Sequence, residues 1–115
     1  MARRTDPTPA TVRLVRERDK HACARCATTN QLTTHHRRNR GMGGSRWPGI
    51  NLPSNLLTLC GSGTTGCHGW VTDHPLGARA LGLAVSMHAD PATVPVTTWQ
   101  GTYLLTNMGE LETTR

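Results

Sequence analysis

The sequence predicts a small α+β fold, and three features of the chain lead to this prediction. Thr8-Pro9 is a helix start, because threonine caps a first turn and proline fits its first position, so residues 10–20 are expected to be helical. Residues 31–36 carry the β-branched threonines typical of a short strand, and residues 56–59 are a second strand or turn candidate. Four cysteines, in a chain without phenylalanine, offer a way to cross-link a thin apolar core.

A chain of 115 residues is expected to form one domain, 1–115. Within it, residues 1–8 are predicted to be a flexible basic lead-in and residues 10–83 to form the functional core. Residues 84–115 are predicted to be an extension of short strands joined by turns, with the strands at 83–87, 94–99 and 102–106.

Positive charge is concentrated in the first part of the chain. Residues 1–46 contain eleven Lys and Arg against three Asp and Glu, whereas residues 47–115 contain two against four. This distribution suits a polyanion such as DNA lying along the basic part, with a merely soluble basic surface as the alternative. No secretory signal or membrane-spanning apolar stretch is visible, so we expect a cytoplasmic protein without a membrane partner.

The cysteines occur in two pairs, Cys23-x2-Cys26 and Cys60-x6-Cys67. Thiolates are soft ligands, and zinc accepts four of them in tetrahedral geometry, so the pairs predict a structural Zn2+. The second spacing is longer than the usual two to four residues. Two disulfides or buried free thiols are the alternatives, and the Cys-x-x-Cys spacing in a cytoplasmic chain favours metal.

A second group of residues, His35-His36, Asn55 and His68, lies between and beside the cysteine pairs. A lone histidine is more often an ordinary core or surface group than a ligand. Two adjacent histidines, a later asparagine and a histidine after a metal-binding cysteine together indicate a second site. The ordinary interpretation applies to the three other histidines, His21, His74 and His88.

The segments HHRRNRGMGG, NLLTLC and GCHGW resemble the HNH family of metal-dependent endonucleases, most closely its small phage-encoded members, over roughly residues 12–85. The resemblance implies a small ββα-metal (HNH) domain with a zinc knuckle, in which 10–83 is the nuclease core, with an N-terminal helix and a C-terminal β-hairpin-like extension. It implies hydrolysis of DNA phosphodiester bonds, by nicking or double-strand cleavage, in the cytoplasm of the phage's host cell.

The same resemblance implies a role for each motif residue. His35 and His68 match ligands of a catalytic divalent ion, which could be Mg2+, Mn2+, Ni2+ or Zn2+, and His36 matches the general base. Asn55 matches the middle asparagine, which orders the loop or ligates the ion. A neutral histidine base predicts that activity falls below about pH 6 to 7.

Two positions leave alternatives open. Some HNH relatives carry a further histidine four residues after the last motif histidine, where this chain has Thr72, so Asn55 or water would complete the coordination. Asn51 lies close enough to compete with Asn55 for the asparagine role.

Four arginines beside the double histidine are predicted to contact DNA phosphates: Arg37, Arg38, Arg40 and Arg46. Through its phage relatives, the resemblance also implies the terminase large subunit and the portal as partners in DNA packaging. A zinc-stapled DNA-binding module without catalysis is the main alternative function. A zinc nucleobase deaminase is set aside, because the chain has no His-x-Glu element.

Overall fold

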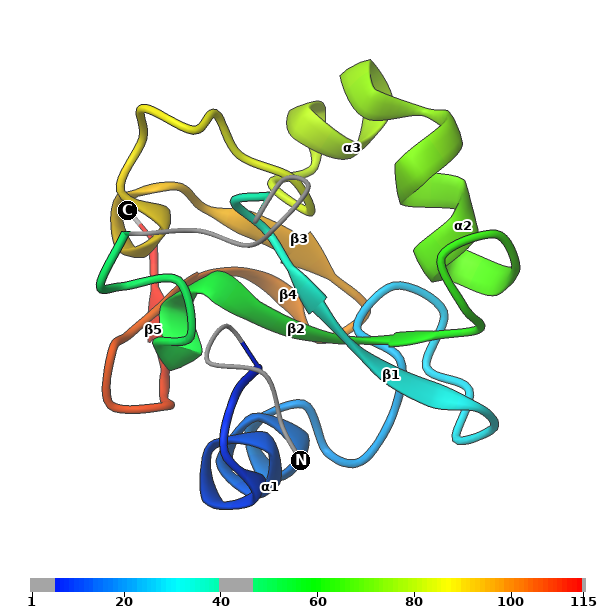
Figure 1. The fold of residues 1–115 in the computed structure, drawn as a ribbon, viewed down its shortest axis with the longest axis horizontal. Helices are drawn as coiled ribbons and strands as arrows, with labels where there is room; N and C mark the ends of the chain where they lie inside the picture. The colour runs from blue at the N-terminus through cyan, green and yellow to red at the C-terminus, as the bar shows by residue number, and fades with distance from the viewer. Residues whose placement is uncertain (1–5, 40–46, 115) are drawn as a thin grey trace.

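Two antiparallel strands, β1 (Leu32–His36) and β2 (Leu56–Cys60), run through the middle of the computed structural model (Figure 1). Leu32 pairs with Cys60 at one end, and His36 pairs with Leu56 at the other. The cysteine end of β2 and the histidine end of β1 therefore lie at opposite ends of the pair. A 3-10 helix, η1 (Pro53–Asn55), leads directly into β2.

The structure describes residues 6–39 and 47–114, and this part of the chain is a small α+β fold. Its helices lie on two sides of the central strands, with α1 on one side and α2 and α3 on the other (Figure 1). Their bounds are α1 Pro9–Arg18, α2 Gly66–Asp73 and α3 Pro75–Ala80. No helix among the described residues has the length and apolar character needed to cross a membrane.

Helix α1 begins where the sequence predicts it. Thr8 accepts a hydrogen bond at 3.2 Å from the backbone N–H of Thr11, and Pro9 occupies the first helical position. Val15 of this helix is fully buried. The cap and the buried position together fix α1 against the strands.

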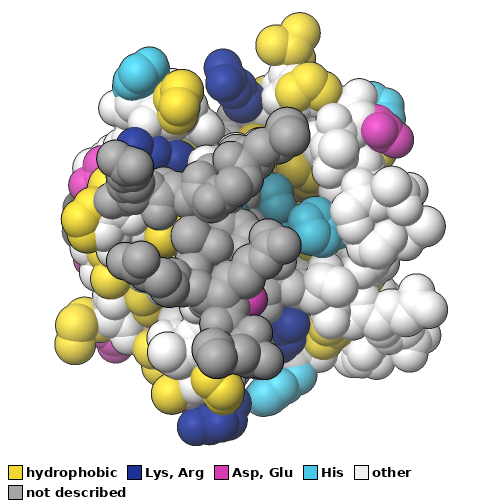
Figure 2. All heavy atoms as spheres, viewed as in Figure 1, with side chains coloured by type: hydrophobic (Ala, Val, Ile, Leu, Met, Phe, Trp, Pro, Cys, Tyr) yellow, Lys and Arg dark blue, Asp and Glu magenta, His cyan; other side chains and the backbone are white. Residues whose placement is uncertain are grey.

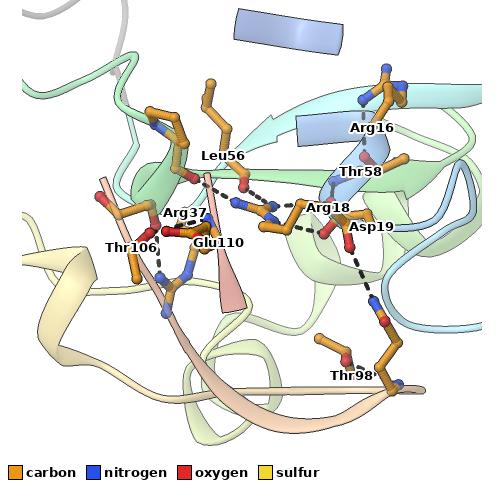
Figure 3. Close-up of polar contacts among 12 residues, drawn as sticks. Arg16, Arg18, Asp19, Arg37, Leu56, Thr58, Thr98, Thr106 and Glu110 are labelled. Atoms are coloured by element: carbon orange, nitrogen blue, oxygen red, sulfur yellow. Dashed lines mark hydrogen bonds and ion pairs between the residues drawn. The ribbon is translucent and has the colours of Figure 1, made fainter. Parts of the chain in front are cut away.

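Arg18, at the end of α1, is buried. Its guanidinium forms an ion pair with Asp19 and donates to the carbonyls of Pro53 and Leu56 at 2.8 and 2.6 Å (Figure 3). Asp19 in turn accepts from the backbone N–H of Thr58 at 2.9 Å. Because every polar atom of the pair is satisfied, this buried pair clamps α1 to η1 and β2.

The last part of the chain forms a second antiparallel sheet in the order β3-β4-β5. Its strands are β3 Val96–Thr98, β4 Gly101–Leu105 and β5 Leu111–Thr113, preceded by the 3-10 helix η2 Pro91–Thr93. Val96 and Leu105 belong to the same buried cluster as Leu57 and Cys67, so the two sheets share one core.

The strand expected at 83–87 is not formed, so this prediction is wrong. Leu83 and Val85 are buried there, and Val85 contributes a single parallel bridge to Arg38. The backbone N–H of Val85 donates to the carbonyl of Arg37 at 2.9 Å, and the carbonyls of Gly82 and Leu83 accept from side chains. The backbone carbonyls of this segment thus bond to the side chains of Arg37 and His35 and not to a neighbouring strand.

Candidate functional site

The four cysteines meet at one point, at the cysteine end of β2. Cys23 and Cys26 come from the turn after α1, Cys60 ends β2, and Cys67 lies in the first turn of α2. Their four Sγ atoms lie within 4.8 Å of one another, and no disulfide joins them. Thiolates at the corners of a zinc tetrahedron lie about 3.8 Å apart, close to the 3.7 Å between Cys26 and Cys60.

This cysteine cluster could hold a structural metal ion such as zinc. In the metal-free protein, burial raises the pKa of Cys67 to about 12 and also raises the pKa of Cys26. Four thiols this close cannot all ionise alone, and a divalent cation would compensate the charge of the thiolates. The donor set and its spacing fit zinc.

Arg25, between the first two cysteines, connects the cysteine cluster to α2. Its Nη1 donates to the Sγ of Cys67 at 3.4 Å, and its guanidinium lies 4.0 Å from the ring centroid of Trp70. On the same helix, the ring of His74 stacks on Trp70 with centroids 4.9 Å apart. Trp70 is therefore a half-buried anchor within this stack.

Four of the predicted site residues line one cavity of about 410 Å³: His35, His36, Arg37 and His68. We call this cavity the histidine pocket. Its walls come from the end of β1, from α2 and α3, and from the segment after α3. The rings of His35 and His68 meet edge to face with centroids 5.1 Å apart. Figure 2 shows histidine side chains side by side near the middle of one face of the molecule.

Each of the three rings is held by a protein group. The Nε2 of His35 lies 2.7 Å from the carbonyl oxygen of Leu83, and the Nε2 of His36 lies 2.8 Å from the Oδ1 of Asn51. The Nδ1 of His68 lies 3.0 Å from the Oγ1 of Thr33. These contacts orient the rings without any ion.

Burial keeps two of these histidines neutral. It lowers the pKa of His35 to about 4, with smaller contributions from the charges of His68, His36 and Arg37, and against the hydrogen bond to Leu83. Burial also lowers the pKa of His68. A neutral imidazole is the form that ligates a metal, so the lowered pKa values leave both rings in the form that could do so near neutral pH.

Asn55 is fully buried and its amide is occupied by backbone groups. Its Oδ1 accepts from the N–H of Arg38 at 2.6 Å, and its Nδ2 donates to the carbonyl of Ile50 at 2.8 Å. It does not line the histidine pocket. These contacts correct the expectation that Asn55 ligates an ion, and they favour its other expected role, the ordering of the loop.

Arg37 was expected to contact phosphate, and the structure contradicts this. Its side chain is buried, with 1% of its surface exposed. Its guanidinium donates to four carbonyl oxygens at 2.7–2.9 Å, those of Ser54, Gly82, Pro91 and Val94. Burial, and then the charge of Arg18, lowers its pKa to about 10, so Arg37 remains protonated at neutral pH.

The other expected DNA contacts have different positions. Arg38 is half-buried, with its guanidinium 4.1 Å from the ring centroid of Trp47, and it lines a second cavity of about 430 Å³. Arg40 and Arg46 lie outside the described residues. The contacts of the histidine pocket therefore do not test the expected phosphate contacts of Arg38, Arg40 and Arg46.

The sequence did not indicate two residues at the histidine pocket, Thr33 and Arg79, and it indicated a third, Asn51, only as a competitor of Asn55. Arg79, on α3, is exposed and lines the pocket. Thr33 and Asn51 contact the rings of His68 and His36. Asn51 had a sequence signal as the second asparagine of the loop, whereas Thr33 and Arg79 had none, because only the folded chain brings them to the histidines.

Comparisons with protein-family models, with curated proteins and with solved structures find no match to this chain.

Proposed function

We propose that this protein is a metal-dependent DNA endonuclease of the HNH type. The observation that carries the proposal is the order β1, β2, α2, which brings His35, His36 and His68 around one cavity. A merely structural set of histidines would not need to converge on solvent-accessible space. The fold described here is also compatible with the strand pair and helix that define the ββα-metal arrangement.

His35 and His68 are the residues that would hold the catalytic cation. Their rings are adjacent and neutral, which fits a divalent ion such as Mg2+, Mn2+, Ni2+ or Zn2+. When bound, the ion would supply positive charge to a scissile phosphate and its leaving oxygen. The remaining positions around the ion would be left to water and substrate.

His36 would act as the general base. Because the Oδ1 of Asn51 only accepts, the Nε2 of His36 carries a hydrogen, and in the neutral ring Nδ1 is then the basic nitrogen. Asn51 thereby selects the tautomer of the base and holds its ring at the wall of the histidine pocket. Such a base contributes roughly 10²–10⁴-fold to a rate.

Arg79 would supply the cationic contact to the substrate phosphate that was expected of Arg37. It is an exposed guanidinium at the wall of the histidine pocket. DNA is the proposed substrate because the basic first part of the chain contributes β1 and its histidines. A role in phage DNA packaging beside the terminase large subunit and the portal is proposed on the resemblance alone.

A non-catalytic DNA-binding module stapled by zinc is the competing function, since the cysteine cluster would serve it equally well. It gives no reason for two neutral histidines and an oriented third one around a single cavity.

The test is nicking of supercoiled plasmid DNA by the zinc-loaded protein with Mg2+, Mn2+, Ni2+ or added Zn2+. The variant is His36→Ala, and the matched control is His88→Ala, an exposed histidine outside the histidine pocket. We expect His36→Ala to lose about 10²–10⁴-fold of the nicking rate while it keeps DNA binding and fold. Absence of nicking with every ion, or equal nicking by His36→Ala, would overturn the proposal in favour of the binding module.

A further inference from the structure

We propose that the hydroxyl of Thr33 is a positioning group that fixes His68 in the tautomer protonated on Nδ1, so that Nε2 is the ligand atom of this histidine. The inference deepens the proposed function and rests on it for the identity of the site. The contacts of Thr33 with β2 and α2 carry it.

Thr33 lies in β1, directly opposite Leu59 of β2. Its Oγ1 donates to the carbonyl oxygen of Leu59 at 3.0 Å, and the same Oγ1 lies 3.0 Å from the Nδ1 of His68. A threonine hydroxyl has one hydrogen and two lone pairs, and a carbonyl oxygen can only accept. Only one arrangement of hydrogens makes both bonds, because the hydroxyl hydrogen goes to Leu59.

The Nδ1 of His68 must then carry its own hydrogen and donate it to Thr33. Only a neutral imidazole, which has a single hydrogen, can ligate a metal ion. In that form the lone pair is on Nε2, the nitrogen on the other side of the ring from Thr33. Hydrogen bonds of this kind to ligating histidines set the tautomer and the ring orientation in metal sites generally.

His35 is fixed in the opposite sense. Its Nε2 lies 2.7 Å from the carbonyl oxygen of Leu83, which can only accept, so its lone pair is on Nδ1. The two adjacent rings therefore offer different nitrogens, Nδ1 from His35 and Nε2 from His68. The backbone sets the first choice, which no side-chain substitution can remove, whereas the side chain of Thr33 sets the second.

The experiment measures the ring nitrogens of His68 by ¹⁵N NMR in the zinc-loaded protein without other divalent ions. We expect the hydrogen on Nδ1 in wild type and in Thr33→Ser, which keeps the hydroxyl. Thr33→Val keeps the shape and strand propensity but loses the hydroxyl, so we expect it to lose this pattern. The matched control is Thr102→Val, whose hydroxyl contacts Thr97 on the exposed face of the second sheet.

Binding of Mn2+ to the same proteins gives a second readout. We expect Thr33→Val to bind Mn2+ about 10–100-fold more weakly than wild type, with Thr33→Ser and Thr102→Val close to wild type. A hydrogen on Nε2 of His68 in wild type would overturn the inference. So would a Thr33→Val protein with an unchanged ring pattern.

The two proposals fail separately. If wild type shows the Nδ1 hydrogen and Thr33→Val loses it, but wild type neither binds Mn2+ nor nicks DNA, the nuclease proposal is overturned and the tautomer assignment stands. If wild type nicks DNA and the tautomer of His68 is the same in Thr33→Val, the tautomer assignment is overturned and the nuclease proposal stands.

Discussion

Cys67 and His68 are neighbours in the first turn of α2, yet they belong to two sites that are held together in different ways. At the cysteine cluster, four sulfurs from three parts of the chain face one another, and an ion at the centre is what would join them. At the histidine pocket, protein groups hold the rings, and a buried arginine joins the segments behind them.

Arg37 is the counterpart of the metal ion that the cysteine cluster could hold. Its guanidinium gathers carbonyl oxygens from Ser54 in η1, from Gly82 after α3 and from Pro91 and Val94 around η2. One of these segments supplies a group to the histidine pocket, since Leu83, which follows Gly82, contacts the ring of His35. The guanidinium of Arg37 therefore holds the carbonyl oxygens together as a bound metal ion would hold the cysteine sulfurs. A chelator can remove the metal ion but not the arginine.

The largest expected effect is at the cysteine cluster. Cys60→Ser should remove one zinc ligand and lower the free energy of unfolding by about 5 kcal/mol or more, because metal binding and folding are coupled in such sites. Denaturant unfolding with and without a strong chelator measures this. The chelator should destabilise wild type and have little further effect on Cys60→Ser. Equal stability of the two proteins, with no zinc in purified wild type, would mean that the cluster is held without metal.

The second largest expected effect is the loss of stability on replacing Arg37. Arg37→Met should lower the free energy of unfolding by about 3–5 kcal/mol, since four buried carbonyls lose their donor and only part of this loss is offset by removing a buried charge. No carboxylate of the described residues forms an ion pair with Arg37. The control is Arg13→Met on the exposed face of α1, expected within about 0.5 kcal/mol of wild type. A stability of Arg37→Met equal to that control would show that the carbonyls find other partners.

A smaller effect distinguishes the histidine pocket by its pH dependence. Burial lowers the pKa of His35 to about 4, whereas an unfolded histidine titrates near about 6.5. Below pH 6.5 the unfolded chain binds a proton that the folded chain does not, so the stability present above pH 6.5 is lost as the pH falls towards 4. The slope approaches about 1.4 kcal/mol per pH unit and the total is about 3 kcal/mol.

The matched variant for that measurement is His35→Gln, which can still donate to the carbonyl of Leu83 but cannot titrate. Both proteins contain the cysteine cluster, so its own acid sensitivity cancels in the difference. Parallel pH profiles of wild type and His35→Gln would show that burial does not hold His35 neutral.

The cysteine cluster and the start of α1 were predictable because their signals are local. Cys23-x-x-Cys26 forms one turn, and Thr8-Pro9 caps one helix, so spacing alone carries the information. The burial of Arg37 was not predictable, because the sequence shows only a basic run, whereas its four acceptors come from residues 17 to 57 positions away. The positions of Thr33 and Arg79 beside the histidines were not predictable for the same reason, because their partners are distant in the sequence.

The expected strand at 83–87 failed for a related reason. Leu83 and Val85 are buried, as a strand would require, but Met87 is exposed, and the carbonyls of Gly82 and Leu83 accept hydrogen bonds from Arg37 and His35. Side chains from β1 and its end took the polar groups that a neighbouring strand would have used. The spacing of apolar residues predicts which side chains are buried, but it does not predict which donors will bond to the backbone carbonyls.

The central claim is that one small fold has two separate ion sites, the cysteine cluster for its shape and the histidine pocket for cutting DNA. His68→Asn tests it most directly, because asparagine can keep the donor to Thr33 and removes the nitrogen proposed to face the ion. The measurement is zinc content, melting temperature and plasmid nicking on one preparation. We expect one zinc per chain, a melting temperature close to that of wild type and no nicking. Retained nicking, or loss of zinc together with the fold, would contradict the separation of the two sites.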